Sequence, residues 1–480
     1  MFRGGRYRPL GDTDCDRIVE TAIDILEKIG IAEAPDWLRE ILLARGARSR
    51  TDGRILFPRK MTEQALRSAC RRVALPGFDE SRGQDIGSGC VHIGTGGAAV
   101  QILDGGSGEY RDSTLSDLYR MMSVLEHCRH VHYGIRPLVA RDMPTPLDLD
   151  LNTAFACVKA TRKPIGVSFD HADHVAPVAH LFDLALQREN GFRRQPFCMA
   201  VIVHVVSPLR FAPEGVAIMR AAIEAGMPLQ ICSAAQAGAT SPASLAGALA
   251  QGLAESLAGL LVVDAIRPGH ACIFAFLPFI SDLRTGAMTG GSGESAVANA
   301  AAAQLLRRLD LPSTVSAGMT DSKREDVQAG YEKGYSVTLA AQAGADMINL
   351  SVGMLGSIMV ASPEALVIDD DMCGAILRTV RGIEVDDGLL DLDSIERVVS
   401  GEGHYLGEPQ TLELMKSEYV YPDLGDRQSV ADWIDAGSEK IWHRARARVR
   451  EVLASEQPNH LPAKAEQAIR AAYDIHLIQE

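Results

Sequence analysis

The chain has 480 residues, 46% hydrophobic and 23% charged, a composition that excludes a disordered chain and indicates a globular protein with a large core. Its 48 basic and 62 acidic residues give a net charge of −14, which disfavours nucleic acid and anionic membrane surfaces and suits cationic ligands or a basic partner. Nine cysteines occur singly, without a C-x-x-C pair, so we expect buried thiols in a reducing cytoplasm rather than disulfides or zinc.

The first 88 residues are predicted to form a helical N-terminal extension. The opening residues lack the apolar core of a signal peptide. Apolar residues at helical spacing then mark three helices, at residues 14–30, 36–44 and 62–69. The pattern changes at residue 90, where a short apolar strand is followed by a glycine-rich segment, 95–114, whose alternation indicates a β-hairpin insertion.

Eight apolar strand candidates recur along the chain from residue 91 to residue 351. They lie at residues 91–94, 131–138, 164–169, 198–203, 229–233, 272–277, 314–318 and 346–351. Helical stretches alternate with them at 115–126, 149–160, 174–187, 213–225, 242–266, 295–309, 325–343 and 363–380. This alternation predicts an α/β fold, a closed (β/α)₈ TIM barrel over residues 89–382, with a doubly wound open sheet as the alternative.

Two further segments need separate interpretations. The most apolar run, residues 245–266, is interrupted by Gln251, Glu255 and Asp264, and so is predicted to be a buried helix rather than a membrane span. Residues 383–480 are helical and charged in pattern, which predicts a C-terminal helical extension.

In a TIM barrel the active site lies at the carboxyl ends of the strands, which names candidate residues directly. These are Thr95, Arg136, Asp170 with His171, His204 with Ser207, Ser233, Phe276, Asp321 with Lys323, and Ser351. Asp321 stands out because it follows the strand at 314–318 in a run of four polar residues, Thr320 to Lys323. The alternative is that Asp321 only caps the next helix, since aspartate is preferred at that position.

Motifs for other kinds of chemistry are weak or missing. Asp170, His171 and His174 in the segment DHADH could hold a metal ion, but capping of the following helix is the more common role for such residues. The sequence contains neither a phosphate-binding G-x-x-x-x-G-K-[ST] loop nor a G-x-S-x-G nucleophile motif. We therefore expect no metal site on the chain.

Five segments resemble the trimethylamine methyltransferase family. They are HIGTGG (92–97), SGESAVANAAAAQLLRRLDLPS (292–313), GMTDSKREDVQAGYEK (318–333), VIDDDMCGAILRTVRGIEV (367–385) and GEGHYL (401–406). The resemblance implies a (β/α)₈ barrel that transfers a methyl group from a methylated amine to the cobalt of a separate corrinoid protein. It also implies that this chain resembles a non-pyrrolysine member acting on glycine betaine or another quaternary amine, because only standard residue types occur in it.

A quaternary ammonium group is favoured by aromatic faces and carboxylates. With Asp321 as the catalytic candidate, the expected substrate-binding residues are Thr95, Arg136, His204, Phe274, Phe276, Tyr331 and His404. Phe279 and Tyr133 are further aromatic residues near strand ends, and for each aromatic taken singly, core packing is the more common explanation. Arg136 could bind a substrate carboxylate if the amine is a betaine.

The expected partners follow from the same resemblance. The corrinoid is carried by a cognate partner protein, no cofactor is held tightly by this chain, and a homo-oligomer is left open. Two alternatives remain: a barrel lyase that uses a Schiff-base lysine, and a barrel that binds a quaternary amine without turnover. The eight predicted strands contain no lysine, which makes the lyase the weaker alternative.

Overall fold

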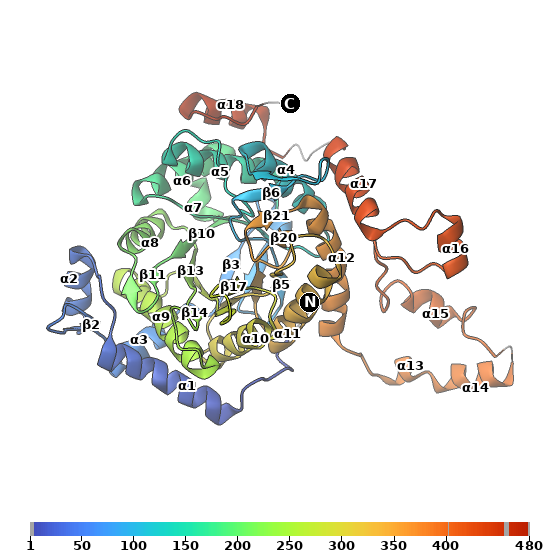
Figure 1. The fold of residues 1–480 in the computed structure, drawn as a ribbon, viewed down its shortest axis with the longest axis horizontal. Helices are drawn as coiled ribbons and strands as arrows, with labels where there is room; N and C mark the ends of the chain where they lie inside the picture. Colours follow the sequence, from blue (N-terminus) through green and yellow to red (C-terminus); the bar gives the residue numbers. More distant parts are fainter. Residues whose placement is uncertain (1–3, 402, 456–459, 479–480) are drawn as a thin grey trace.

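A closed barrel of eight parallel strands lies at the centre of the protein, for which the computed structural model describes residues 4–401, 403–455 and 460–478 (Figure 1). Its strands are β5 (His92–Ile93), β8 (Gly134–Ile135), β9 (Ile165–Val167), β10 (Cys198–Val203), β13 (Leu229–Ser233), β15 (Cys272–Phe276), β18 (Ser313–Ser316) and β19 (Met347–Asn349). The hydrogen-bonded order runs from β8 through β9, β10, β13, β15, β18 and β19 to β5. A parallel bridge between Gly94 and Tyr133 joins the two ends, so the predicted barrel is confirmed and the open sheet is excluded.

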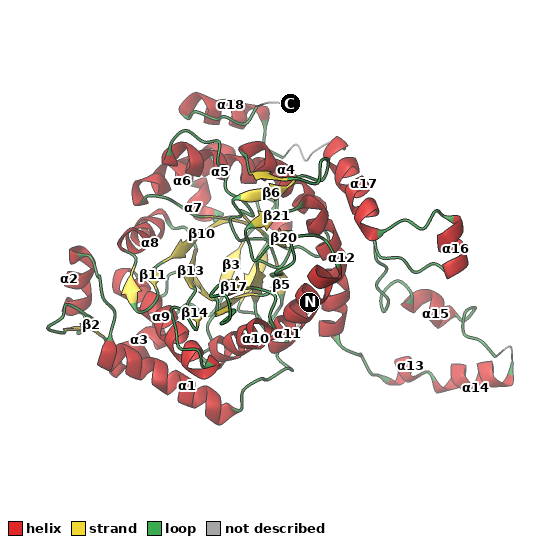
Figure 2. Ribbon diagram, in the orientation of Figure 1, coloured by secondary structure: helices red, strands yellow, loops and turns green. Residues whose placement is uncertain are grey.

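Helices surround the barrel on all sides (Figure 2). They are α4 (Leu115–His127), α5 (Pro146–Ala160), α6 (Val175–Ala185), α7 (Gly191–Arg194), α8 (Pro213–Ala225), α9 (Leu245–Ile266), α10 (Gly293–Arg308), α11 (Val327–Ala343) and α12 (Pro363–Arg381). Side-chain caps explain several starts: Thr114, Thr145, Ser292, Asp326 and Ser362 each accept a hydrogen bond from a backbone N–H in the first turn.

The N-terminal extension contains helices and two hairpins. The helices are α1 (Asp12–Asp24), continued by the π-helix η1 (Ile25–Ile29), α2 (Asp36–Ala44) and α3 (Arg59–Ser68), as the periodicity predicts. The hairpins are β1 (Arg48–Ser49) with β2 (Ile55–Leu56), and β3 (Val73–Leu75) with β4 (Gln84–Ile86). Neither hairpin was predicted, because their strands lie in apolar runs of at most three residues, too short to show a pattern.

The second hairpin closes one end of the barrel. Val73, Leu75 and Ile86 are fully buried and pack in one cluster with inward-facing barrel residues. Those barrel residues are Tyr133, Ile135, Met199, Ile273 and Met347. Most of them lie toward the amino ends of the strands, so the hairpin covers the barrel interior at that end.

Short strands extend the barrel at its carboxyl end. The insertion after β5 is the predicted hairpin, β6 (Gln101–Leu103) with β7 (Tyr110–Asp112), and it pairs with β21 (Val360–Ala361), which in turn pairs with β20 (Met354–Leu355). A second small sheet joins β14 (Gln236–Ala237), β16 (Phe279–Ser281) and β17 (Met288–Thr289). A third pairs β11 (Val205–Val206) with β12 (Arg210–Phe211).

The C-terminal extension is helical, as expected, and has two parts. Helices α13 (Asp387–Leu390), α14 (Leu392–Ser400), α15 (Pro409–Leu414) and α16 (Val430–Asp435) project sideways from the ring of helices (Figure 1). Helices α17 (Ile441–Ala454) and α18 (Ala463–Ala472) return to the barrel, where α17 packs on α4 and α12, and α18 packs on α6.

Two expectations about buried segments are met. Helix α9 is the one helix in the described part of the chain that is long and apolar enough to cross a membrane, and 89% of its most apolar window is buried inside the protein. It packs between barrel strands β13 and β15 and helix α1, as a core helix does. None of the nine cysteines, all of which the structure describes, forms a disulfide, and eight are buried.

Candidate functional site

The carboxyl end of strand β18 is built around Gly318. This residue has φ +95°, and a Cβ there would lie 2.5 Å from the Cα of Ser351, in the loop after the neighbouring strand β19. Only glycine permits both the left-handed backbone and this close approach. The loop that follows is thereby turned across the barrel end and carries Asp321 with it.

Asp321 joins three loops at this end of the barrel. Its carboxylate accepts hydrogen bonds from the hydroxyls of Thr289 and Ser357. It also accepts from the backbone N–H of Gly290 at 2.9 Å and of Gly291 at 3.4 Å. Asp321 therefore ties the segment before α10 to the loops after β18 and β19, and it is not a helix cap.

The cap of α11 is Asp326, whose side chain accepts from the N–H of Ala329 at 2.9 Å. The helix starts at Val327, so Asp321 lies outside it and the capping alternative is wrong. Thr320 and the backbone N–H of Asp321 instead donate to Glu332, on the second turn of α11. The polar run after β18 is thus a loop. Glu332 of α11 holds it from one side, and Thr289 and Ser357 of the neighbouring loops hold it from the other.

The four hydrogen bonds keep the Asp321 carboxyl ionised. Its half-buried position raises the pKa, but the bonds from Ser357, Thr289 and the two glycine amides outweigh burial, and the pKa of Asp321 lies below its ordinary value. A fixed negative charge at the barrel end is the result.

A cleft of about 460 Å³ opens beside this cluster. Its lining residues come from β14, β16, β17 and the start of α10, and they include Thr289, Asp282 and Glu294. Arg284 also lines it, and its hydrogen bonds to Asp282 lower the pKa of that carboxyl to about 2. Because Thr289 both lines the cleft and donates to Asp321, the carboxylate lies directly behind the cleft wall.

Polar side chains occupy the barrel interior above the hairpin that closes it. The Tyr133 hydroxyl donates to the Asn349 side chain at 2.5 Å, and the Thr314 hydroxyl donates to Gln230 at 3.5 Å. The side-chain Nε2 of Gln230 is buried and has no hydrogen-bond partner in the described structure. Gln230, Thr314 and Asn349 were not among the residues predicted from the sequence, although each is a polar residue on the inward side of a barrel strand.

The structure places both predicted phenylalanines on the outer side of strand β15. Phe274 and Phe276 are 1% exposed and belong to the core between barrel and helices. A Cβ at Gly252 of α9 would lie 2.4 Å from the ring of Phe276, which fixes the direction of that ring. The core-packing alternative describes both residues, whereas Phe279 packs with the inward-facing Ala275 and Leu277.

His204 and Arg136 also point between strands and helices. His204 is fully buried, its Nε2 bonds the carbonyl of Glu255 on α9 at 2.9 Å, and burial lowers its pKa to about 4. The Arg136 guanidinium lies near Asp150 of α5 and Asp170, and burial lowers its pKa. Its Nε is buried and has no hydrogen-bond partner in the described residues, so Arg136 keeps an unused donor.

The remaining predicted residues are scattered. Thr95 is buried and donates to the carbonyl of Ile135 at 2.6 Å, which links the first two barrel strands. Tyr331 is 55% exposed on α11 and stacks with Tyr335 at 6.4 Å between ring centres. His404 is exposed on the C-terminal extension, outside the barrel. The structure therefore does not bring these residues together with Asp321.

The DHADH segment forms a local polar network. Nδ1 of His174 lies 2.7 Å from the Asp150 carboxylate, and the N–H of Asp170 donates to the same group at 2.8 Å. His171 occupies the cap position of the short helix that follows but makes no capping bond with its side chain. Within the described residues, no three His, Cys, Asp or Glu side chains are arranged to hold a metal ion.

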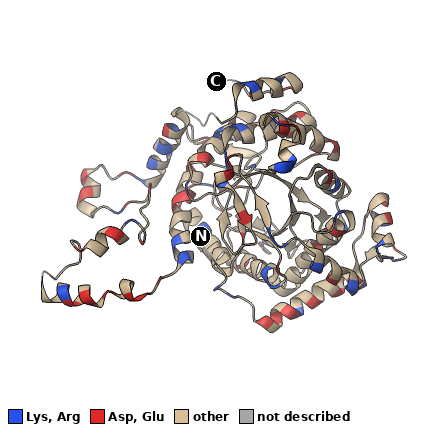
Figure 3. Cartoon of the chain, turned by 180° about the vertical axis from the view of Figure 1, so that it is seen from behind, with Lys and Arg blue, Asp and Glu red and all other residues tan. Residues whose placement is uncertain are grey.

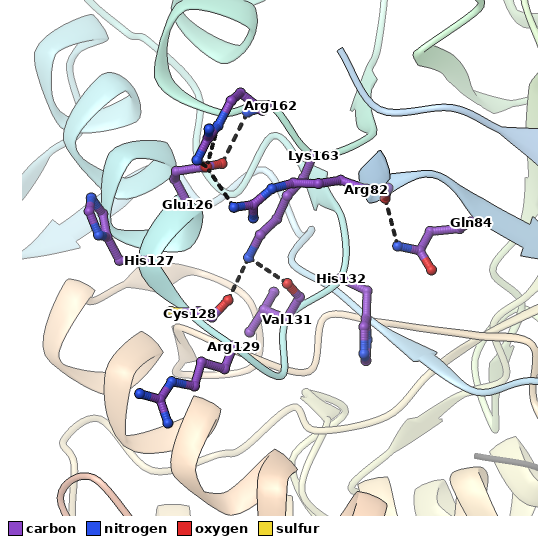
Figure 4. Close-up of a pocket in the computed structure, with 10 residues that line it drawn as sticks. All are labelled: Arg82, Gln84, Glu126, His127, Cys128, Arg129, Val131, His132, Arg162 and Lys163. Atoms are coloured by element: carbon purple, nitrogen blue, oxygen red, sulfur yellow. Dashed lines mark hydrogen bonds and ion pairs between the residues drawn. The ribbon is translucent and has the colours of Figure 1, made fainter. Parts of the chain in front are cut away.

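A second cavity, of about 410 Å³, opens at the other end of the barrel (Figure 4). Glu126 accepts two hydrogen bonds from the Arg162 guanidinium there, at 2.9 and 2.7 Å. The ammonium of Lys163 donates to the carbonyls of Leu125, Cys128 and Val131 at 2.6–2.8 Å. All three N–H donors of the Lys163 ammonium are thus used in hydrogen bonds to backbone carbonyls, and the side chain offers no free amine for Schiff-base chemistry.

The family model described as trimethylamine methyltransferase (MTTB) matches residues 3–475. The chain belongs to this family. The match spans the N-terminal extension, the barrel and nearly all of the C-terminal extension.

Among curated proteins, the chain is 28% identical over 474 residues to a glycine betaine methyltransferase of Desulfitobacterium hafniense, covering 97% of this chain and 96% of that protein. It is also 28% identical over 454 residues to a trimethylamine methyltransferase of Methanosarcina thermophila, covering 92% of each. Among solved structures, the monomethylamine methyltransferase of Methanosarcina barkeri matches with a TM-score of 0.48 and 12% identity, over 94% of this chain and 95% of that one.

Proposed function

We propose that this protein transfers a methyl group from a quaternary amine, with glycine betaine as the leading candidate, to the cobalt of a corrinoid carried by a separate protein. The observation that carries the proposal is the family match over residues 3–475. A relative named for glycine betaine, aligned over 97% of the chain, supports the substrate class. So does the sequence, which consists of standard residues throughout, whereas the family resemblance implies pyrrolysine in the trimethylamine enzymes of methanogens.

A quaternary amine suits a site without a dedicated general acid. When its methyl group is taken, the nitrogen keeps the electron pair of the broken bond and leaves as a neutral tertiary amine. Cobalt(I) of the corrinoid would supply the electron pair for the new bond to the methyl group. The protein's task is then to hold the cation and aim one methyl at the open end of the barrel.

The residues at the barrel end fit that task. The fixed charge of Asp321 lies behind the cleft and Glu294 lines it, so two carboxylates can attract a cation there, while Asp282 is paired with Arg284. Inside the barrel, Nε2 of Gln230 is a buried donor without a partner in the described structure and is suited to a substrate carboxylate, whereas Arg136 points between strands and helices. An amine that carries both groups, such as a betaine, would use both features.

The test is methylation of a corrinoid protein, reduced to cobalt(I) and followed by its visible spectrum. We expect glycine betaine to drive loss of the cobalt(I) spectrum in the presence of the enzyme, and trimethylamine to leave it unchanged. Methylation with trimethylamine, but not with any quaternary amine, would overturn the substrate class. Calorimetric binding of a quaternary amine, with no methylation of any corrinoid protein tested, would instead support a protein that only binds the amine.

A further inference from the structure

The cavity at the amino end of the barrel, here called the amino-end cavity, collects positive charge (Figure 4). Its walls come from the hairpin of β3 and β4, from the turn after α4 and from the turn before β9. Among the lining residues Glu126 is the one acidic side chain, and the basic ones are Arg82, Arg129, Arg162 and Lys163. A net charge of +3 therefore surrounds about 410 Å³, in a chain with acidic and basic residues spread over every part and a total charge of −14 (Figure 3).

The buried cation of this cavity has no counter-charge in contact with it. The Lys163 ammonium is 4% exposed and forms no ion pair within the described residues, since its donors go to backbone carbonyls. Glu126 is already bound by Arg162, and Arg129 lies 3.8 Å from Asp423 with its own side chain 73% exposed. A buried charge without a partner of opposite sign is unfavourable, so an anion in the cavity would stabilise this end of the barrel.

Two lining side chains keep hydrogen-bond donors for such an anion. Arg82 ends the short helix η2 (Glu80–Arg82) between β3 and β4, and in the part of the chain that the structure describes its guanidinium donates no hydrogen bond. Its one contact is an ion pair with Glu126 at 3.4 Å. The second donor is His132. Because its Nδ1 accepts from the N–H of Ile93, the proton of the neutral ring lies on Nε2.

Carboxylates behind the cavity wall do not cancel this charge. The side chain of Asp79 accepts from the N–H and the hydroxyl of Ser81 at 3.0 and 2.7 Å. Asp370 accepts from the backbone N–H groups of Arg129 and His130 at 3.0 and 2.7 Å. Neither carboxylate forms an ion pair with a lining side chain in the described structure. The excess positive charge is therefore left for a ligand.

We propose that the amino-end cavity binds a small anion through a phosphate group. A phosphate carries up to two negative charges and several acceptor oxygens, which suits a net charge of +3 and the forked donors of an arginine such as Arg82. A carboxylate has one charge and two oxygens and would leave more of the site unpaired. The bound phosphate would join Arg82 on the hairpin to His132 before β8, and so hold the hairpin on the barrel. This site lies at the opposite end of the barrel from Asp321 and is separate from the methyl-transfer chemistry.

Calorimetry on the full-length protein tests the binding. The buffer has low salt, no phosphate and a pH of about 8, where a phosphate group is a dianion. We expect saturable binding of one inorganic phosphate or one AMP per chain, about tenfold or more tighter than acetate. Binding of both would show that the phosphate group is recognised, binding of AMP alone would make the ligand a phosphate ester, and binding of inorganic phosphate alone would make it the free ion. If neither saturates by about 10 mM, or if acetate binds equally well, the proposal is wrong.

A pair of variants locates the site. Arg82→Gln removes the guanidinium that has free donors and should weaken binding of the phosphate ligand by about tenfold or more. The matched control is Arg120→Gln, which removes the same charge from an exposed position on α4 outside the cavity and should leave the affinity unchanged. Circular dichroism checks that both proteins are folded. Equal affinities in the two variants would overturn the proposal. The assay contains neither amine nor corrinoid protein, so its failure is distinct from failure of the proposed function.

Discussion

At the scale of single residues, Asp321 shows how a loop carboxylate differs from a cap. Both roles use the same residue type, because a carboxylate accepts well from backbone N–H groups. The difference lies in the donors: Asp326 receives a bond from its own helix, while Asp321 receives bonds from loops that are about 30 residues away on both sides in the chain. Long-range donors of this kind cannot be recognised from local spacing.

We predict that Asp321→Asn lowers kcat/KM for the quaternary amine by more than tenfold. The substitution removes the fixed charge and replaces one accepting oxygen by a donor, which opposes the Thr289 and Ser357 hydroxyls or the glycine amides. Steady-state methyl transfer per folded molecule is the measurement.

The matched control is Asp326→Ala. It removes the cap of α11, which costs about 0.5–2 kcal/mol of stability, and should leave turnover per folded molecule unchanged. If Asp321→Asn behaves like this control, with lower stability but full turnover, Asp321 holds loops together and has no effect on the substrate.

At the scale of elements, the seam between β5 and β8 closes the barrel with two histidines. The rings of His92 and His132 meet edge to face at 5.6 Å, and Nδ1 of His132 accepts from the N–H of Ile93 at 2.9 Å. Burial is the main cause that lowers the pKa of His92 to about 4 and of His132 to about 3. Both rings are therefore neutral where the barrel is closed.

We predict that acid destabilises the barrel well above pH 4. In the unfolded chain each histidine binds a proton below about pH 6.5, while the folded protein does not, so the free energy of unfolding falls as the pH decreases from 6.5 toward 4. Each ring contributes up to about 1.4 kcal/mol per pH unit. Denaturant unfolding at several pH values measures the slope.

The variant His132→Asn keeps an acceptor for the N–H of Ile93 but cannot be protonated in this range, so it should reduce the slope by up to about 1.4 kcal/mol per pH unit. The control His443→Asn changes an exposed histidine on α17 and should leave the slope as it is. A slope that is the same in all three proteins would show that the seam does not govern acid stability.

The sequence was sufficient to predict all eight barrel strands and the main helices, because each strand lies in a mostly apolar segment of four or more residues and these segments alternate regularly with helical stretches. The hairpin of β3 and β4 was not predictable, since its three-residue strands become strands only by packing on Tyr133, Met199 and other residues far away in the chain. The direction of side chains was the other gap. Phe274 and Phe276 follow the same strand as the inward Ala275, and only the barrel geometry decides which set faces the interior.

At the scale of the whole molecule, the N-terminal hairpin, the loops at the carboxyl end of the barrel and the C-terminal extension have different structural roles. The N-terminal hairpin closes the lower end of the barrel, the loops around Asp321 shape the upper end, and the C-terminal extension divides into helices that return to the barrel and a projecting segment, residues 383–440, that does not. Charge follows the same division, because residues 383–440 hold −11 of the net −14.

We predict that purified protein transfers methyl groups without a metal ion bound to the chain itself. A quaternary nitrogen departs as a neutral amine, so no Lewis acid is needed to stabilise the leaving group. The donors present in the described residues agree, because Asp170, His171 and His174, the best candidates in the sequence, are spread over a local network with Asp150.

Elemental analysis and a chelator test this prediction together. We expect substoichiometric zinc and transition metals in active protein, and full methyl transfer after treatment with EDTA followed by removal of the chelator. The double variant His171→Ala with His174→Ala serves as a control for the candidate ligands, and it should retain turnover per folded molecule. Stoichiometric zinc that is lost together with activity, both in this variant and after chelation, would contradict the prediction and make the DHADH segment a metal site.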